Sequence, residues 1–97
     1  MGTLSYSITD YGRRGSNIQS SKHVASAAHA TTTTQSSLAT SLAAGMVLVA
    51  HADEAMRIRF GGINATASTG HYIAAGTQRE FEIRSGDTGV ASIIDVA

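Results

Sequence analysis

The chain has 97 residues and no cysteine, and its seven basic residues balance seven acidic ones, so the formal net charge is zero. A chain of this length forms at most one small domain with a marginal core. The lack of cysteine excludes a disulfide framework, a thiolate metal site and a thiol nucleophile, and the lack of a basic excess argues against a nucleic-acid partner. Because no apolar run has the length of a signal peptide or a membrane span, we expect a protein that is made in the cytoplasm and makes no membrane contact.

The first 20 residues alternate apolar and small polar side chains and then enter a glycine-rich turn. In TLSYSIT, Leu4, Tyr6 and Ile8 recur at every second position, which is typical of a strand with one apolar face. The same pattern suits an extended arm that adds a strand to the sheet of another molecule. We therefore expect residues 1–20 to form either an N-terminal arm or an edge strand. If they form an arm, the partner-binding residues are Leu4, Tyr6, Ile8, Tyr11, Arg13 and Arg14.

Residues 20–44 consist almost entirely of Ser, Thr and Ala. Four consecutive threonines favour strand, because β-branched side chains lose rotamer freedom in helices and suit pleated surfaces. We expect strands over residues 22–27 and 30–38. A short helix over residues 37–44 is the alternative, since Ala39, Leu42 and Ala43 lie at helical spacing.

The second half of the chain contains clearer strand patterns, separated by polar or glycine-rich turns. They cover residues 46–51, 56–60, 63–67, 72–73, 78–85 and 90–96. Strands that recur about every eight to twelve residues with such turns are typical of an antiparallel sandwich or barrel. We therefore predict that residues 21–97 form a single all-β domain, a small antiparallel β-sandwich or a jelly-roll-like barrel, from which the N-terminal segment extends as an arm.

The clearest strand pattern is AMRIRFGG, at residues 55–62. Alternation with period two sends Met56, Ile58 and Phe60 to the core and Arg57 and Arg59 to the opposite face.

QREFEIRS, at residues 78–85, repeats this pattern with Phe81 and Ile83 inward and with Glu80 and Glu82 outward. If the two strands are neighbours, the two outward arginines lie near these two glutamates. In the last strand we expect Val90, Ile94 and Val96 to share one face.

No local pattern in the chain is typical of catalysis or of a metal site. The histidines do not follow the HxH, HxxxH or HExxH spacings of metal ligands; they are His23, His29, His51 and His71. Serine and threonine are abundant, but no GxSxG nucleophile motif occurs, and the glycine pair at 61–62 is not followed by the GK[ST] of a phosphate loop. We therefore expect no enzymatic activity, no cofactor and no metal.

The elements from about residue 35 onward follow a recognisable order. It runs through the apolar strand after Gly45, MRIRFGG, INATAS, HYIAAGT, an FEI strand, GDTG and SIIDVA. This order resembles that of small structural proteins of tailed-bacteriophage virions. The resemblance implies a β-sandwich present in many copies on the particle, most specifically a capsid decoration (cement) protein that binds and stabilises the head shell, or else a minor head or tail component.

The same resemblance implies the partners. They are the major capsid protein or other virion subunits, together with further copies of the chain in a trimer or dimer, and the location is the virion. A charged content of only 14% agrees with this interpretation, because a surface so poor in charge is more typical of a protein covered by neighbours.

A different class of function is also open, namely a β-sandwich module that binds a ligand such as a carbohydrate. Such sites normally present exposed aromatic rings. Because both phenylalanines are expected in the core, Tyr72 beside His71 is the candidate platform and the possible loop contact. A cellular scaffold subunit without any link to viruses is a third alternative.

Overall fold

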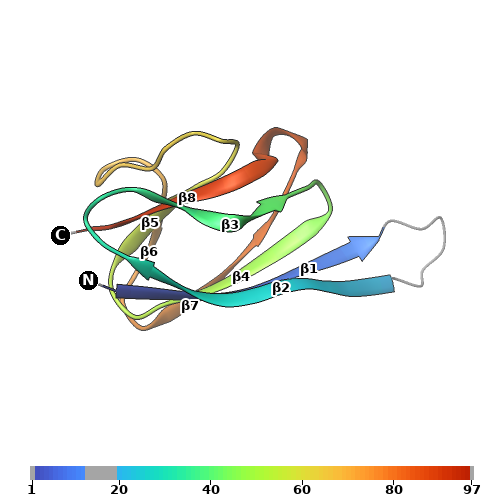
Figure 1. Cartoon of the computed structure of the whole chain (residues 1–97), viewed down its shortest axis with the longest axis horizontal. Coiled ribbons are helices and arrows are strands. Elements are labelled where there is room, and N and C mark those ends of the chain that lie inside the picture. The colour runs from blue at the N-terminus through green and yellow to red at the C-terminus, as the bar shows by residue number, and fades with distance from the viewer. Residues whose placement is uncertain (1, 13–19, 97) are drawn as a thin grey trace.

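The computed structural model describes residues 2–12 and 20–96, and these form two four-stranded antiparallel sheets packed face to face (Figure 1). The first sheet has the order β2-β1-β4-β7 and the second has the order β3-β8-β5-β6. The strands are β1 (Gly2–Gly12), β2 (Ser20–Thr31), β3 (Ser36–Leu42), β4 (Met46–Ala52), β5 (Met56–Arg59), β6 (His71–Ile73), β7 (Thr77–Glu82) and β8 (Gly89–Asp95), with a short 3-10 turn η1 (Ser85–Asp87) before the last. The predicted antiparallel sandwich is confirmed. The sheets do not close on each other, so the barrel alternative is wrong.

β1 is an interior strand of the first sheet rather than an arm or an edge strand. Leu4 lies opposite His29 of β2 on one side and opposite Ala52 of β4 on the other. The apolar face of β1, formed by Leu4, Tyr6 and Ile8, is buried between the sheets. The chain itself therefore supplies the partners that the alternating pattern needs along both edges of the strand.

The segment rich in Ser, Thr and Ala forms two strands with other boundaries than those expected. β2 continues to Thr31, and residues 32–35 make the turn into β3, so most of the threonine run lies in a turn. The Thr34 amide donates to the Thr32 hydroxyl at 3.1 Å, a local bond that competes with strand pairing. The helix expected as an alternative over residues 37–44 is replaced by β3.

The prediction for β5 is correct for its faces and wrong for its neighbour. Met56 and Ile58 are fully buried and Phe60 is 8% exposed. However, β5 pairs with β6 and β8 in the second sheet, whereas β7 lies next to β4 in the first, so Arg57 and Arg59 do not face the β7 glutamates. Side-chain periodicity assigns faces within a strand and carries no information on which strand is the partner.

The residues of β8 expected to share one face, Val90 and Ile94 among them, do so, and this face is the outer one. Ala91, Ile93 and Asp95 point inward and are buried, while Val90 is 38% exposed. The inward Asp95 is accommodated because the Thr31 hydroxyl donates to its Oδ1 at 2.5 Å. This bond joins β2 to β8 and so connects the two sheets.

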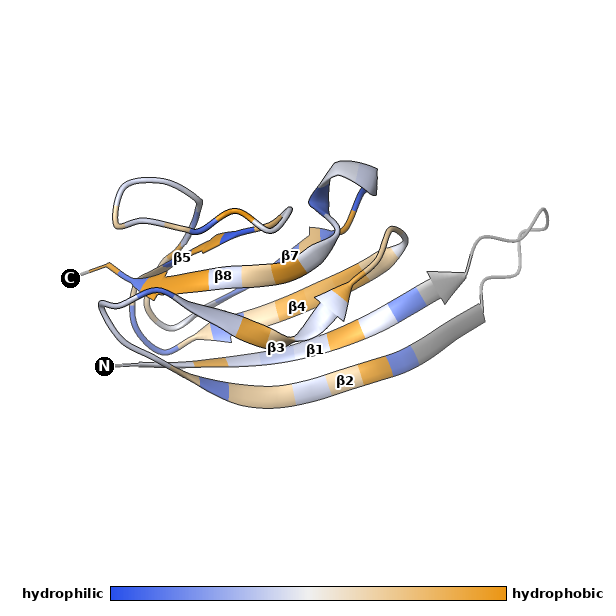
Figure 2. Cartoon of the chain, turned by 45° about the horizontal axis from the view of Figure 1, so that its top comes forward, coloured by the Kyte–Doolittle hydropathy of each residue, from blue (hydrophilic) through white to orange (hydrophobic). Residues whose placement is uncertain are grey.

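The core lies between the sheets and is mostly aliphatic. Figure 2 shows apolar residues recurring along β1, β3, β4 and β8. The larger members of the core are Leu4, Tyr6, Ile8, Leu38, Leu42, Leu48, Met56, Ile58, Phe60, Ile73, Phe81, Ile83 and Ile93. Within the part of the chain that the structure describes, no helix has the length and apolar character required to cross a membrane.

The outer face of the second sheet is partly covered by residues 61–70. The Ala65 amide donates to the Ser92 hydroxyl at 2.9 Å, and both residues are buried. Arg57 holds the end of this loop, donating from Nε to the Ala67 carbonyl at 3.0 Å and from Nη1 to the Gly70 carbonyl at 3.1 Å. The outward arginine of β5 therefore fastens a loop instead of forming a cross-strand ion pair.

Candidate functional site

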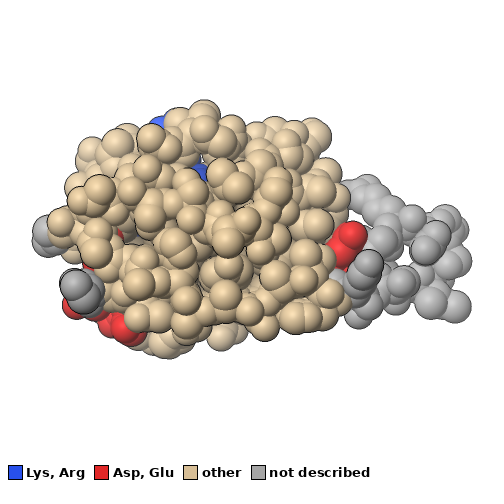
Figure 3. Space-filling model, viewed as in Figure 1, with Lys and Arg blue, Asp and Glu red and all other residues tan. Residues whose placement is uncertain are grey.

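One flank of the sandwich is built from a stretch of chain without charged side chains. Residues 23–52 contain no Lys, Arg, Asp or Glu. Their first part supplies β2 from His23 onward, the turn at 32–35 and β3, and β2 and β3 are edge strands of the two sheets on the same side. In Figure 3, which looks onto this side, coloured charge is sparse and lies mostly near the margins. We call this surface the β2–β3 flank.

Apart from His23, the exposed side chains of the β2–β3 flank are short. They are Val24, Ser26, Ala27, Ala28, Ala30, Thr32, Thr33, Thr34, Ser37, Ala39 and Ser41. Methyl and hydroxyl groups offer no acid, base or charged ligand for chemistry. They allow another backbone to approach closely, because nothing long has to move aside.

The uncharged surface continues onto the outer face of the first sheet. There, Ser5, Ser7 and Thr9 of β1 lie beside His51, Val49 and Val47 of β4. Val47 and Val49 in turn lie beside Glu82 and Glu80 of β7, where charge reappears. The result is a sheet face of small polar and apolar groups with a row of carboxylates along one margin.

The opposite flank, between β6 and β7, holds the two residues expected at a loop contact. His71 and Tyr72 are adjacent in β6, so their side chains leave it on opposite faces. The His71 ring packs 5.8 Å from the Phe60 ring and 5.3 Å from the Phe81 ring, between centroids. The Tyr72 ring is 45% exposed on the outer face, and the Arg57 guanidinium carbon lies 5.3 Å from its centroid. The structure therefore does not bring the two side chains together on one surface.

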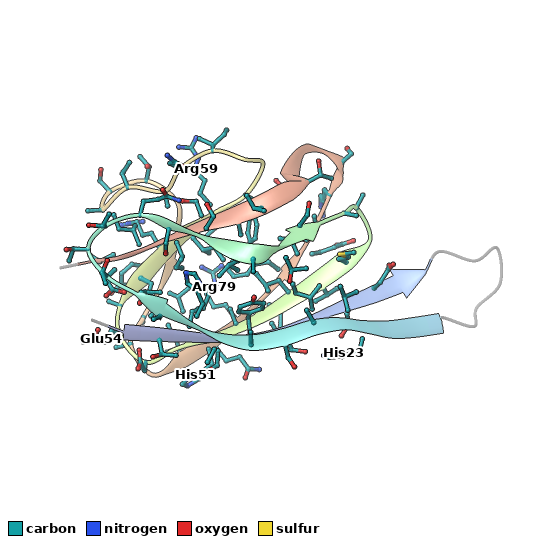
Figure 4. The ribbon with its side chains drawn as sticks, viewed as in Figure 1. His23, His51, Glu54, Arg59 and Arg79 are labelled. Atoms are coloured by element: carbon teal, nitrogen blue, oxygen red, sulfur yellow. The ribbon has the colours of Figure 1, made fainter. Side chains whose placement is uncertain are left out.

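Arg79 is a residue of this flank that the sequence analysis did not single out. Its Nη1 donates to the Tyr72 carbonyl at 2.7 Å, and its guanidinium carbon lies 4.9 Å from the Phe81 centroid. Arg79 thus joins β7 of one sheet to β6 of the other. In the view of Figure 4 it projects within the outline of the sandwich, while Arg59, His51 and Glu54 lie toward its margins. The signal was present in the sequence, because Arg79 stands two residues before the inward Phe81.

The residues of the N-terminal segment that were expected to bind a partner differ in where the structure places them. Leu4, Tyr6 and Ile8 are part of the core and present no free surface. Of Tyr11 only the backbone is described, opposite Ser21. The remaining two, Arg13 and Arg14, lie outside the described residues.

The histidines are dispersed over the molecule. His23 and His51 lie on the outer face of the first sheet, opposite Thr9 and Ser5 of β1. His29 Nε2 lies 2.8 Å from the hydroxyl oxygen of Ser36. Among the described residues, no group of three or more His, Cys, Asp or Glu side chains could hold a metal ion.

Comparison of the chain with protein-family models, with curated proteins and with solved structures gave no match. Function therefore has to be inferred from the surfaces of this chain itself.

Proposed function

We propose that this protein is a non-enzymatic structural subunit of a tailed-phage virion, and specifically a capsid decoration protein that binds the major capsid protein and stabilises the head shell. The observation that carries the proposal is the uncharged surface formed by the β2–β3 flank and the outer face of the first sheet. A minor head or tail component would use the same surface in the same way.

The chemistry of this surface suits a permanent contact. Short Ala, Ser and Thr side chains lose little rotamer entropy when they are buried. No charged side chain of residues 23–52 would have to be desolvated. A partner with a matching surface can therefore bury the flank at low cost, and many such contacts on a shell hold its subunits together by mass action.

The direct test uses heads of the parent phage that were assembled without this chain. Binding is measured by co-sedimentation, and shell stability by the temperature at which the heads release their DNA. Ala39→Lys places an ammonium group on the exposed surface of β3, and we expect it to weaken binding to the heads and to reduce the stabilisation. The matched control is Ala75→Lys, in the exposed turn between β6 and β7.

The control variant should bind and stabilise the heads like the unmodified protein. If the unmodified protein does not bind heads, the capsid proposal fails. If Ala39→Lys binds as well as the control, the β2–β3 flank is not the contact.

A second candidate, a carbohydrate-binding module, is favoured by the exposed ring of Tyr72 beside the Arg57 guanidinium. In this case a glycan array should show binding that Tyr72→Ala abolishes, while binding to heads is unaffected by that substitution. An array without any bound glycan would remove this candidate.

A further inference from the structure

The sandwich has four sheet edges, and three of them carry features that discourage pairing with another strand. β7 contains Arg79, Glu80 and Glu82. β6 is only three residues long, and β3 has a register shift between Ser37 and Ser41. Charged residues, shortness and irregularity are the means by which natural proteins protect sheet edges.

The fourth edge, that of β2, has none of these features over residues 25–31. β2 is 12 residues long, and the chain contains no proline. The only register shift in its pairing with β1 lies between Ile8 and Thr9, which leaves Val24 without an opposite residue and the segment after it regular. Lys22 is the only charged residue of the strand and precedes this segment.

The hydrogen bonds of β1 show which backbone groups of β2 face the open edge. The Asp53 amide donates to the Thr3 carbonyl at 3.3 Å, and the Thr3 amide donates to Asp53 Oδ1 at 2.7 Å, so the backbone of Thr3 is turned toward β4. Because successive residues of a strand turn their N–H and C=O groups to alternate sides, Leu4 and its even-numbered successors turn theirs toward β2.

The residues of β2 opposite Leu4, Tyr6 and Ile8 are His29, Ala27 and Ala25. These three therefore use their backbone groups for β1, and the residues between them turn theirs away from it. The groups on the open edge belong to Ser26, Ala28 and Ala30.

Space for a further strand exists beside this edge. Ser26, Ala28 and Ala30 have exposed, short side chains on the outer face of the sheet. On the inner face Ala27 is exposed and Ala25 is half-buried, so the second sheet does not extend over this part of β2. The larger side chain of this segment is that of His29, which lies on the inner face, is half-buried and has its Nε2 2.8 Å from the Ser36 hydroxyl oxygen.

We propose that the occupant of this edge is β2 of a second copy of the chain, paired antiparallel about a two-fold axis at Ala28. In this register Ala28 faces Ala28 of the partner subunit, and Ser26 faces Ala30 of the partner subunit. The same three residues supply the donors and acceptors on both sides, as an isologous contact requires. No like charges are placed opposite each other, because the paired segment has no charged residue.

Pairing in this manner joins the first sheets of two copies into one continuous sheet. Its uncharged outer face is doubled, and the β7 glutamates lie at its two distant margins. The contact over residues 25–31 is only about 20 Å long, which is short for a stable interface. We therefore expect a reversible dimer that forms in solution at high concentration. The inference concerns how two copies meet and does not depend on which particle carries them.

Sedimentation equilibrium of the complete chain over a range of concentrations tests the dimer. The apparent mass should rise from 10.0 kDa toward twice that value. Ala28→Lys and Ala28→Glu should each abolish the rise, since each places two like charges opposite each other at the two-fold axis. An equimolar mixture of the two variants should restore it, because the unlike charges then face each other. Ala75→Lys is the matched control and should dimerise normally.

Cross-linking tests the register. The chain has no cysteine, so Ala28→Cys introduces a single thiol, which should form an intermolecular disulfide under mild oxidation because facing Cα atoms lie roughly 5.5 Å apart in an antiparallel pair. Ala75→Cys should form little or none. A chain that stays at 10.0 kDa at every concentration overturns the proposal. So does a dimer that survives Ala28→Lys, or a failure of the Lys and Glu variants to rescue each other while both remain folded by circular dichroism.

Discussion

The hydrogen bond between Thr31 and Asp95 is the most informative single contact to remove. Thr31 is 1% exposed and Asp95 is 4% exposed, and the Thr31 hydroxyl donates to Asp95 Oδ1 at 2.5 Å. Thr31→Val replaces the hydroxyl with a methyl group of similar size, so it opens no cavity and keeps a β-branched residue in the strand. What it removes is one donor to a buried carboxyl group.

The expected loss follows from the chemistry of this bond. Hydrogen bonds to charged groups contribute about 1.5–3 kcal/mol, against about 0.5–1.5 kcal/mol for neutral pairs. We expect Thr31→Val to lower the free energy of unfolding by about 2 kcal/mol. The backbone bond from the Asp95 amide to the Thr32 carbonyl remains in the variant, so the loss is limited to the side-chain bond. For a domain of this size that loss corresponds to a decrease in Tm of roughly 8–16 °C.

Urea denaturation followed by circular dichroism measures this loss, and a double-mutant cycle with Asp95→Asn assigns it to the pair. In the Asn background Thr31→Val should cost less, since the acceptor is then neutral. Thr33→Val, in the exposed turn beside it, is the matched control and should change stability by less than about 0.5 kcal/mol. A loss for Thr31→Val no larger than that of the control would refute the reasoning.

Two further predictions concern the loop that covers the second sheet. Gly70 has a φ of 121°, and a Cβ at this position would lie 3.0 Å from the Ile58 carbonyl oxygen. Gly70→Ala should therefore lower the free energy of unfolding, measured by urea denaturation, by about 1–3 kcal/mol. Gly86→Ala is the control and should leave the urea denaturation curve nearly unchanged, because a Cβ there would meet nothing within 4 Å. Arg57→Lys cannot donate to the Ala67 and Gly70 carbonyls in the same fork geometry, so amide hydrogen exchange over residues 65–69 should become faster; exchange rates equal to those of the unmodified protein would contradict this role of Arg57.

Local periodicity was enough to predict the faces of most strands. Met56, Ile58, Phe81 and Ile83 are buried as expected, because the side of a strand on which a residue lies depends only on alternation within that strand. The partner of a strand depends on contacts far along the chain. Hence the placement of Arg57 beside the β7 glutamates was wrong even though both strands were correctly identified.

Two features that the sequence pattern does not reveal, the buried Asp95 of β8 and the turn within the threonine run, have a common physical cause. In each, a polar side chain satisfies its hydrogen bond within the fold, and hydropathy alone does not anticipate this. Asp95 lies on the inward face of β8, where an apolar residue is normally expected. Its hydrogen bond with the Thr31 hydroxyl makes this burial possible. The hydroxyl of Thr32 stabilises a turn where β-branched residues favour strand.

The candidate surface could be predicted only in part from the sequence. The lack of charge over residues 23–52 is visible in the sequence. What it cannot show is that β2 and β3, which belong to different sheets, lie on the same flank. The divergence of His71 and Tyr72 onto opposite faces, by contrast, follows from simple alternation and was predictable.

The position of β8 has a consequence for folding during synthesis. The first sheet consists of β1, β2, β4 and β7, all of which leave the ribosome before β8 does. In the second sheet β8 lies between β3 and β5, so neither of these strands meets that partner until residues 89–95 have emerged. A nascent chain therefore passes through a stage in which one sheet can form while the buried face of Leu4 and Ile8 still lacks its cover. Strand edges and apolar surface exposed in this way favour aggregation, and completion of the domain depends on the strand that is made last among those described.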